Sequence, residues 1–252
     1  MKSFKIAKYQ VMEILSSIRT FYAIFLLVIV LLSILSFRSG GAHSSSGLDF
    51  ASWIFLFIAG LNAFKRSFYF SQANNISRKT FFKGLVMGVF PITFAMSVID
   101  VVINRIYNNF VPSPTNFDMI YSSFRDTDMR YGARMVWTPA NDIYTLFSTA
   151  IWQFALYSMI FLLGILITLI YYRSSKLVKV IVSVLPIALI IFSNIIYQLL
   201  PVAFWESVGA LIAGAFGWES RNPYMAVLSF GILASLFSGV AYLLTRRAVV
   251  KD

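Results

Sequence analysis

The sequence predicts an all-α polytopic membrane protein, built as one transmembrane domain over residues 1–252. Two observations support this class: long apolar runs recur along the chain, and 59% of its residues are hydrophobic while only 12% are charged. A soluble domain is less apolar than this, and a helix needs about 20 apolar residues to cross a bilayer core about 30 Å thick. The six predicted transmembrane helices are residues 20–37, 48–64, 85–107, 141–172, 179–200 and 224–244.

Basic residues are distributed unevenly over the predicted loops, and this orients the chain. With both termini on one side, that side carries 15 of the 21 Lys and Arg residues, including all nine Lys. The positive-inside rule then predicts cytoplasmic N- and C-termini in the plasma membrane. Topology and contact with anionic membrane lipid therefore explain the net charge of +11, and no nucleic-acid partner is indicated.

The segment before the first span has the pattern of an amphipathic helix. Apolar residues repeat at helical spacing over residues 2–18, while Lys2, Lys5 and Lys8 share a different face. This predicts an interfacial helix lying in the cytoplasmic headgroup plane. A cleaved signal peptide is the alternative, but the basic stretch before the apolar run is about 19 residues long, which favours a retained first span.

Two segments on the predicted outer side are not simple connections. Residues 108–140 mix Pro, Asn, Asp, Arg and aromatic residues, and we expect a small ordered cap with ion pairs there. Residues 201–223 are apolar and rich in Gly and Ala, yet too short and too interrupted to cross the bilayer and return. A short re-entrant or interfacial helical segment between the fifth and sixth spans fits this pattern.

The cytoplasmic loop 65–84 combines aromatic residues with turn and cap signals. Asn74 and Asn75 form a turn signal, and Ser77 suits the N-cap of the third span. The aromatic residues fit either a position at the membrane interface or a docking surface for a cytoplasmic partner. The candidate docking residues are Phe68, Tyr69, Phe70, Ser71, Asn74, Asn75, Ser77, Arg78 and Lys79.

A few polar residues fall inside the predicted spans. Asp100 lies toward the outer end of the third span, where it is either a solvated interfacial residue or part of a pathway or gate. Asn104, one turn later, is its nearest predicted hydrogen-bond partner. The candidate pathway residues are Asp100, Asn104, Gln153, Asn194 and Gln198.

Motifs for catalysis are missing from the sequence, so we expect no enzyme. There is no phosphate-binding Gly-x-x-x-x-Gly-Lys-Ser/Thr loop, no Cys, and a single His, His43. Glu occurs only at positions 13, 206 and 219, which argues against a paired-glutamate membrane protease. No cofactor or metal site is expected on this chain, and a passage, docking or scaffold role powered by another subunit fits best.

These features together resemble the permease subunit of an ABC-2-type exporter. The residues that carry the resemblance are 77–84, which read Ser-Arg-Lys-x-Phe-Phe-x-Gly before the third span. The resemblance implies a coupling helix near Arg66–Asn75 that docks into a separate ATPase subunit, where ATP and Mg²⁺ would bind. It also implies a second permease chain, as a homodimer around a central pathway. The size, the aromatic content and the loop after the third span are similar to permeases of phenol-soluble-modulin-type peptide exporters.

The expected function is therefore export of an amphipathic peptide or lipid-like substrate, driven by the ATPase partner. Two other classes remain open at the level of sequence. A structural or regulatory membrane protein would tolerate substitutions in the loop 65–84. An ion-coupled secondary transporter would need Asp100 to titrate or to bind an ion.

Overall fold

The computed structural model describes residues 2–38, 46–122, 124 and 137–248, and within them the secondary structure is helical. The helices are α1 Lys2–Arg38, α2 Asp49–Ala63, α3 Lys65–Ala73, α4 Arg78–Tyr107, α5 Asn116–Tyr121, α6 Ile143–Arg173, α7 Lys176–Ile191, α8 Ser193–Leu199, α9 Val202–Ala215 and α10 Pro223–Arg246. The predicted all-α class is confirmed for these residues.

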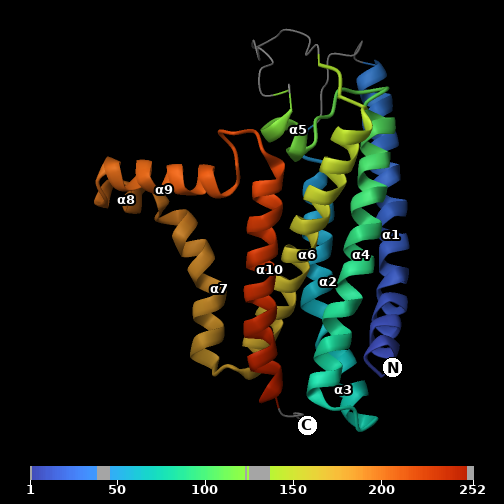
Figure 1. Cartoon of the computed structure of the whole chain (residues 1–252), viewed down its shortest axis with the longest axis vertical. Helices are drawn as coiled ribbons and strands as arrows, with labels where there is room; N and C mark the ends of the chain where they lie inside the picture. Colours follow the sequence, from blue (N-terminus) through green and yellow to red (C-terminus); the bar gives the residue numbers. More distant parts are fainter. Residues whose placement is uncertain (1, 39–45, 123, 125–136, 249–252) are drawn as a thin grey trace.

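The long helices form a bundle with α6 at its centre. Helix α6 packs against α2, α4 and α10, and α1 covers the other side of α4 (Figure 1). The N-terminal end of α1, helix α3, the α6–α7 connection and the C-terminal end of α10 meet at one end of the bundle, which we call the basic end after its Lys and Arg residues. The opposite end carries α5, and we call it the α5 end.

Four helices are long and apolar enough to cross a membrane: α1, α4, α6 and α10. They correspond to the first, third, fourth and sixth predicted spans. Large apolar side chains such as Leu27 on α1, Phe94 on α4 and Leu236 on α10 are exposed on the outside of the bundle. Apolar surface on this scale needs a non-aqueous environment, so the chain is membrane-embedded.

The second and fifth predicted spans correspond to shorter helices. Helices α2 and α7 have 15 and 16 residues, fewer than the number that crosses a hydrocarbon core. Helix α7 ends where the Phe192 N–H bonds to the Ala188 carbonyl, and the chain then turns. Helices α8 and α9 follow crosswise to the bundle, and Tyr197 stacks on Trp205 with ring centroids 5.6 Å apart. The crosswise pair therefore begins at residue 193, earlier than the predicted segment 201–223.

The predicted interfacial helix is not a separate element. Residues 2–18 and the first span form the single 37-residue helix α1. The reason lies in α4, where a Cβ added to Gly84 would come 2.6 Å from the Ser3 carbonyl oxygen. Because this glycine lets the two helices approach closely, Ile6 and Ile14 are buried in the hydrophobic core rather than in lipid headgroups.

Glycines also bring α2 and α6 together. Gly60 and Gly164 face each other, and a Cβ on Gly164 would lie 2.5 Å from the Phe57 carbonyl oxygen. Thr168 adds a hydrogen bond of 2.6 Å from its hydroxyl to the Leu61 carbonyl. Both helices run from the α5 end toward the basic end, so this close contact fixes their parallel register.

Candidate functional site

The strongest candidate site is a buried carboxylate that joins three long helices. Asp100 of α4 is only 5% exposed. The Tyr22 hydroxyl of α1 donates to its Oδ1 at 2.8 Å, and the Tyr157 hydroxyl of α6 donates to its Oδ2 at 2.6 Å. Asp100 is therefore buried and is not the solvated interfacial residue that the sequence left open, while a pathway or gating role stays a prediction.

Two further buried polar side chains lie on α2 and α6, the helices next to this carboxylate. Ser52 of α2 is fully buried and lies beside Asp100, and its hydroxyl has no hydrogen-bond partner. Gln153 of α6 is also fully buried, and neither its Nε2 nor its Oε1 has a hydrogen-bond partner. It stands one helical turn before Tyr157, so both side chains share one face of α6. We call Asp100, Tyr22, Tyr157, Ser52 and Gln153 the Asp100 cluster.

A second carboxylate begins α2 at the same level. Asp49 and Gln153 each stand eleven residues before the facing glycines of α2 and α6, so the parallel register places them opposite each other. Asp49 is buried, and its Oδ2 accepts the Asn116 backbone N–H at 2.9 Å and the Asn116 side-chain amide at 3.4 Å. This bond ties the start of α2 to the start of α5.

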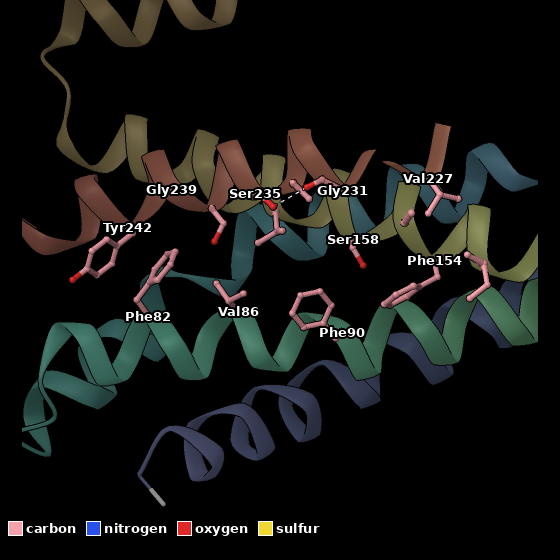
Figure 2. Close-up of a pocket in the computed structure, with 15 residues that line it drawn as sticks. Phe82, Val86, Phe90, Phe154, Ser158, Val227, Gly231, Ser235, Gly239 and Tyr242 are labelled. Carbon is pink, nitrogen blue, oxygen red and sulfur yellow. Dashed lines mark hydrogen bonds between the residues drawn. The ribbon is translucent and has the colours of Figure 1, made fainter. Parts of the chain in front are cut away.

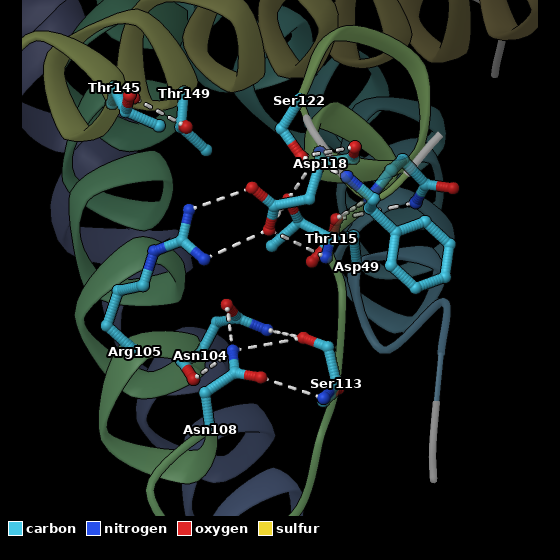
Figure 3. A network of polar contacts seen from close by, with 12 residues as sticks. Asp49, Asn104, Arg105, Asn108, Ser113, Thr115, Asp118, Ser122, Thr145 and Thr149 are labelled. Atoms are coloured by element: carbon cyan, nitrogen blue, oxygen red, sulfur yellow. Dashed lines mark hydrogen bonds and ion pairs between the residues drawn. The ribbon is translucent and has the colours of Figure 1, made fainter. Parts of the chain in front are cut away.

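A third buried carboxylate holds α5 against α4 (Figure 3). Both Nη atoms of Arg105 donate to Asp118 at 3.0 Å, and the side chain of Asp118 is fully buried. Asp118 also accepts from the backbone N–H and hydroxyl of Thr115, which closes a capping box at the start of α5. Asn104 contributes by donating from its Nδ2 to the Ser113 carbonyl at 2.9 Å.

The far side of α5 reaches the turn between α9 and α10. The Tyr121 hydroxyl donates to the Phe216 carbonyl at 2.7 Å, and the ring packs on Trp152. Burial raises the pKa of Tyr121 above its ordinary value, so the hydroxyl remains a neutral donor. Helix α5 therefore caps the bundle, and the region Arg125–Arg134 in which ion pairs were predicted lies outside the described residues.

Charge is unbalanced in this part of the bundle. Asp49, Asp100 and Asp118 are all buried, and Arg105 bonds Asp118 alone. Among the residues that the structure describes, no Lys or Arg forms an ion pair with Asp49 or Asp100. An uncompensated carboxylate inside a protein is costly, so these two positions call for a neutralising group.

The predicted docking loop contains helix α3, but only part of it faces outward. Phe68 is fully buried in an aromatic cluster with Phe64, Phe81 and Tyr172, at ring-centroid distances of 5.0, 5.5 and 6.2 Å from Phe68. Ser71 is buried as well. Because Phe68 anchors α3 to the bundle, it is not part of an accessible docking surface.

The remaining residues of this loop form an exposed surface at the basic end. Phe70 is 50% exposed and stacks on Tyr9 of α1, with ring centroids 4.9 Å apart. Tyr69 is partly buried, Ser77 caps α4 by accepting from the Thr80 N–H, and Arg78 donates to the Arg246 carbonyl at 3.0 Å. The exposed residues of this surface are Lys65, Arg66, Phe70, Ala73, Asn74, Asn75, Ser77, Lys79 and Lys83.

An open groove of about 710 Å³ runs between α4, α6 and α10 (Figure 2). Phe82 and Phe90 line it from α4, and Phe154 lines it from α6. The facing wall on α10 consists largely of small residues, including Gly231 and Gly239. The groove is predominantly apolar and would accept a hydrocarbon chain.

The predicted pathway residues separate into two groups. Asp100, Asn104 and Gln153 are each buried, and Asn104 bonds Ser113 and Asn108 rather than Asp100. Gln198 is exposed on α8, away from the bundle, and the side chain of Asn194 lies outside the described part of the structure. Sequence reasoning missed Tyr22, Tyr157 and Ser52, because Tyr and Ser are common in membrane spans and only the fold brings these residues to Asp100. Comparison with protein families, curated proteins and solved structures finds no match to this chain.

Proposed function

We propose that the chain is the permease subunit of an ABC exporter, driven by a separate ATPase that binds ATP and Mg²⁺. The observation that carries the proposal is α3, a nine-residue helix at the basic end with one face anchored in the bundle and the other face exposed. A helix placed in this way could be displaced by a cytoplasmic partner and transmit that displacement to the membrane helices on which it packs.

The contacts of α3 explain how force would travel. Through Phe68 the helix packs on residues of α2, α4 and α6. Arg66 forms an ion pair of 3.3 Å with Glu13, which connects α3 to α1 as well. A displacement of α3 therefore acts on four helices at once, while its exposed surface remains free for the partner.

The six crossings and the second permease chain belong to the same proposal. Helices α2 and α7 would complete the six spans with flanking residues, and α8–α9 would lie at the outer interface. Both faces of α7 and α9 are exposed, which supports contact with lipid or with a second copy. The apolar groove between α4, α6 and α10 suits an amphipathic peptide or a lipid-like substrate better than a charged solute.

The test is copurification of an ATP-binding protein with the chain from its native membrane in mild detergent. The triple variant Lys65→Glu, Phe70→Ala and Lys79→Glu changes only exposed residues of the docking surface, and we expect it to lose the ATPase. The double variant Arg173→Glu and Lys176→Glu makes the same two charge reversals at the α6–α7 connection of the basic end and should retain it. If no ATPase accompanies the wild-type chain, or if the triple variant retains it fully, the proposal fails.

A further inference from the structure

We propose that the Asp100 cluster binds a monovalent metal cation inside the bundle, toward the α5 end. The proposal does not rest on the coupling role of α3, because the residues concerned lie at the opposite half of the molecule. It rests on three observations: the charge of the cluster, its unused polar atoms and the chemistry of its donors.

The first observation is the missing positive charge. Asp100 is buried between α1, α4 and α6, and the described residues place no Lys or Arg against it. Arg105 stands about one turn further along α4, but both of its Nη atoms are engaged by Asp118. A bound cation would neutralise the carboxylate where no side chain does.

The second observation is independent of the carboxylates. Gln153 is fully buried on the face of α6 that carries Tyr157, and both polar atoms of its amide lack a partner. Buried polar groups in native proteins are nearly always satisfied, so the unpartnered amide of Gln153 leaves donor and acceptor capacity for a ligand on this face of α6. Ser52 of α2 lies beside Asp100, and its buried hydroxyl has no hydrogen-bond partner either.

The third observation is the donor set. Every candidate ligand is an oxygen: the Asp100 carboxylate, the Ser52 hydroxyl and the Gln153 amide oxygen, with the two Tyr hydroxyls already donating to the carboxylate. Oxygen donors select hard cations and disfavour transition metals, which prefer His or Cys. Asp100 is the one carboxylate among these ligands and balances a single positive charge, since the Oδ2 of Asp49 is engaged by Asn116, whereas Ca²⁺ sites use six to eight oxygens and commonly several carboxylates.

The experiment measures thermal unfolding of the purified full-length chain in mild detergent. Na⁺ is titrated against choline at constant ionic strength, and the titration is repeated with K⁺. We expect a saturable rise in Tm with one of the two metal ions that choline does not produce. The rise should disappear in Asp100→Asn and weaken in Ser52→Ala and Gln153→Met.

Asp142→Asn is the matched control, since Asp142 is a fully exposed carboxylate that caps α6 at the same end. It should show the wild-type response. Equilibrium binding of radioactive Na⁺ to the wild-type protein, with K⁺ as competitor, gives a second measurement that needs no variant to fold. Equal responses to Na⁺, K⁺ and choline, or a metal-specific response that survives in Asp100→Asn, would overturn the proposal in favour of a protonated carboxyl or a buried water.

Discussion

Arg105 is the residue on which the packing of α5 most depends. Its guanidinium forms two bonds to a carboxylate that is fully buried, and that carboxylate also caps α5. Removing one partner of a buried pair leaves the other charge unpaired, which costs about 3–5 kcal/mol.

We therefore expect Arg105→Met to lower the free energy of unfolding by about 3–5 kcal/mol, measured by denaturation in detergent micelles. Arg105→Lys keeps the charge but loses the fork of two parallel bonds, so its loss should be smaller. Equal losses in the two variants would show that the charge contributes little and that the shape of the side chain matters instead.

The two tyrosines of the Asp100 cluster give a second prediction at this scale. Tyr157→Phe and Tyr22→Phe each remove one hydroxyl donor from a buried carboxylate, and we expect each to cost about 1–3 kcal/mol of stability. Tyr157 is the more deeply buried, so its loss should be the larger. Tyr197→Phe, on the exposed surface of α8, is the control and should leave the unfolding midpoint unchanged.

Individual polar residues could be predicted only in part. Asp100 and Gln153 stand out because a charged or amide side chain is rare within an apolar run, and both are buried. Tyr22 gave no such signal, since its ring suits a membrane span and only the fold brings its hydroxyl to Asp100. Phe68 was expected on a docking surface, because sequence position alone does not show which face of a short helix meets the bundle.

At the scale of elements, glycines set how closely the helices approach. Gly84 admits α1 onto α4, and Gly164 admits α2 onto α6. In lipid, helix pairs gain stability from such close contact rather than from the exclusion of water.

We expect Gly164→Ala to destabilise the protein by about 1–3 kcal/mol, because its Cβ would press on the backbone of α2. Gly231→Ala on α10 is the matched control, since an added Cβ there meets nothing within 4 Å. Helix propensity favours Ala over Gly by about 1 kcal/mol, so the control should be neutral or slightly more stable. The measurement is the unfolding midpoint of each variant in the same detergent. Equal midpoints would mean that α2 and α6 can move apart at Gly164 without lowering the stability of the protein.

Elements with strong, long apolar patterns were predictable, whereas packing decided the rest. The pattern predicted α4, α6 and α10 nearly to their ends. The amphipathic pattern of residues 2–18 was also real, but the sequence does not show whether the apolar face meets lipid or another helix. The close approach of α1 to α4 at Gly84 shows that this face meets another helix.

At the scale of the whole molecule, the N-terminal end of α1, the C-terminal end of α10 and α3 share the basic end, while α5 lies at the other. This arrangement agrees with the even number of crossings and with the grouping of Lys residues expected from the sequence. Six crossings stay a prediction, because α2 and α7 are apolar but shorter than a full span, and the described residues contain four helices of spanning length.

The chain has no Cys, so single cysteines can report its orientation without a background. We expect Ala73→Cys, exposed at the end of α3, to react with a membrane-impermeant thiol reagent only in opened or inverted membranes. Ser220→Cys, exposed before α10, should react in intact cells. Reaction of both from one side would contradict the arrangement, and the reverse pattern would place the basic end outside.

Helix α1 contacts both halves of the molecule, α3 at the basic end and Asp100 nearer the α5 end. Glu13 holds α3 at one point along it, and Tyr22 touches Asp100 about 13 Å further on, at 1.5 Å per residue. A tilt of about 5° around the first point would shift the Tyr22 hydroxyl by about 1 Å, enough to stretch its 2.8 Å bond beyond hydrogen-bonding distance. Cation binding at the proposed Asp100 site and the position of α3 would then be coupled through α1, and the ion pair of Glu13 and Arg66 would transmit the movement of α3 to α1.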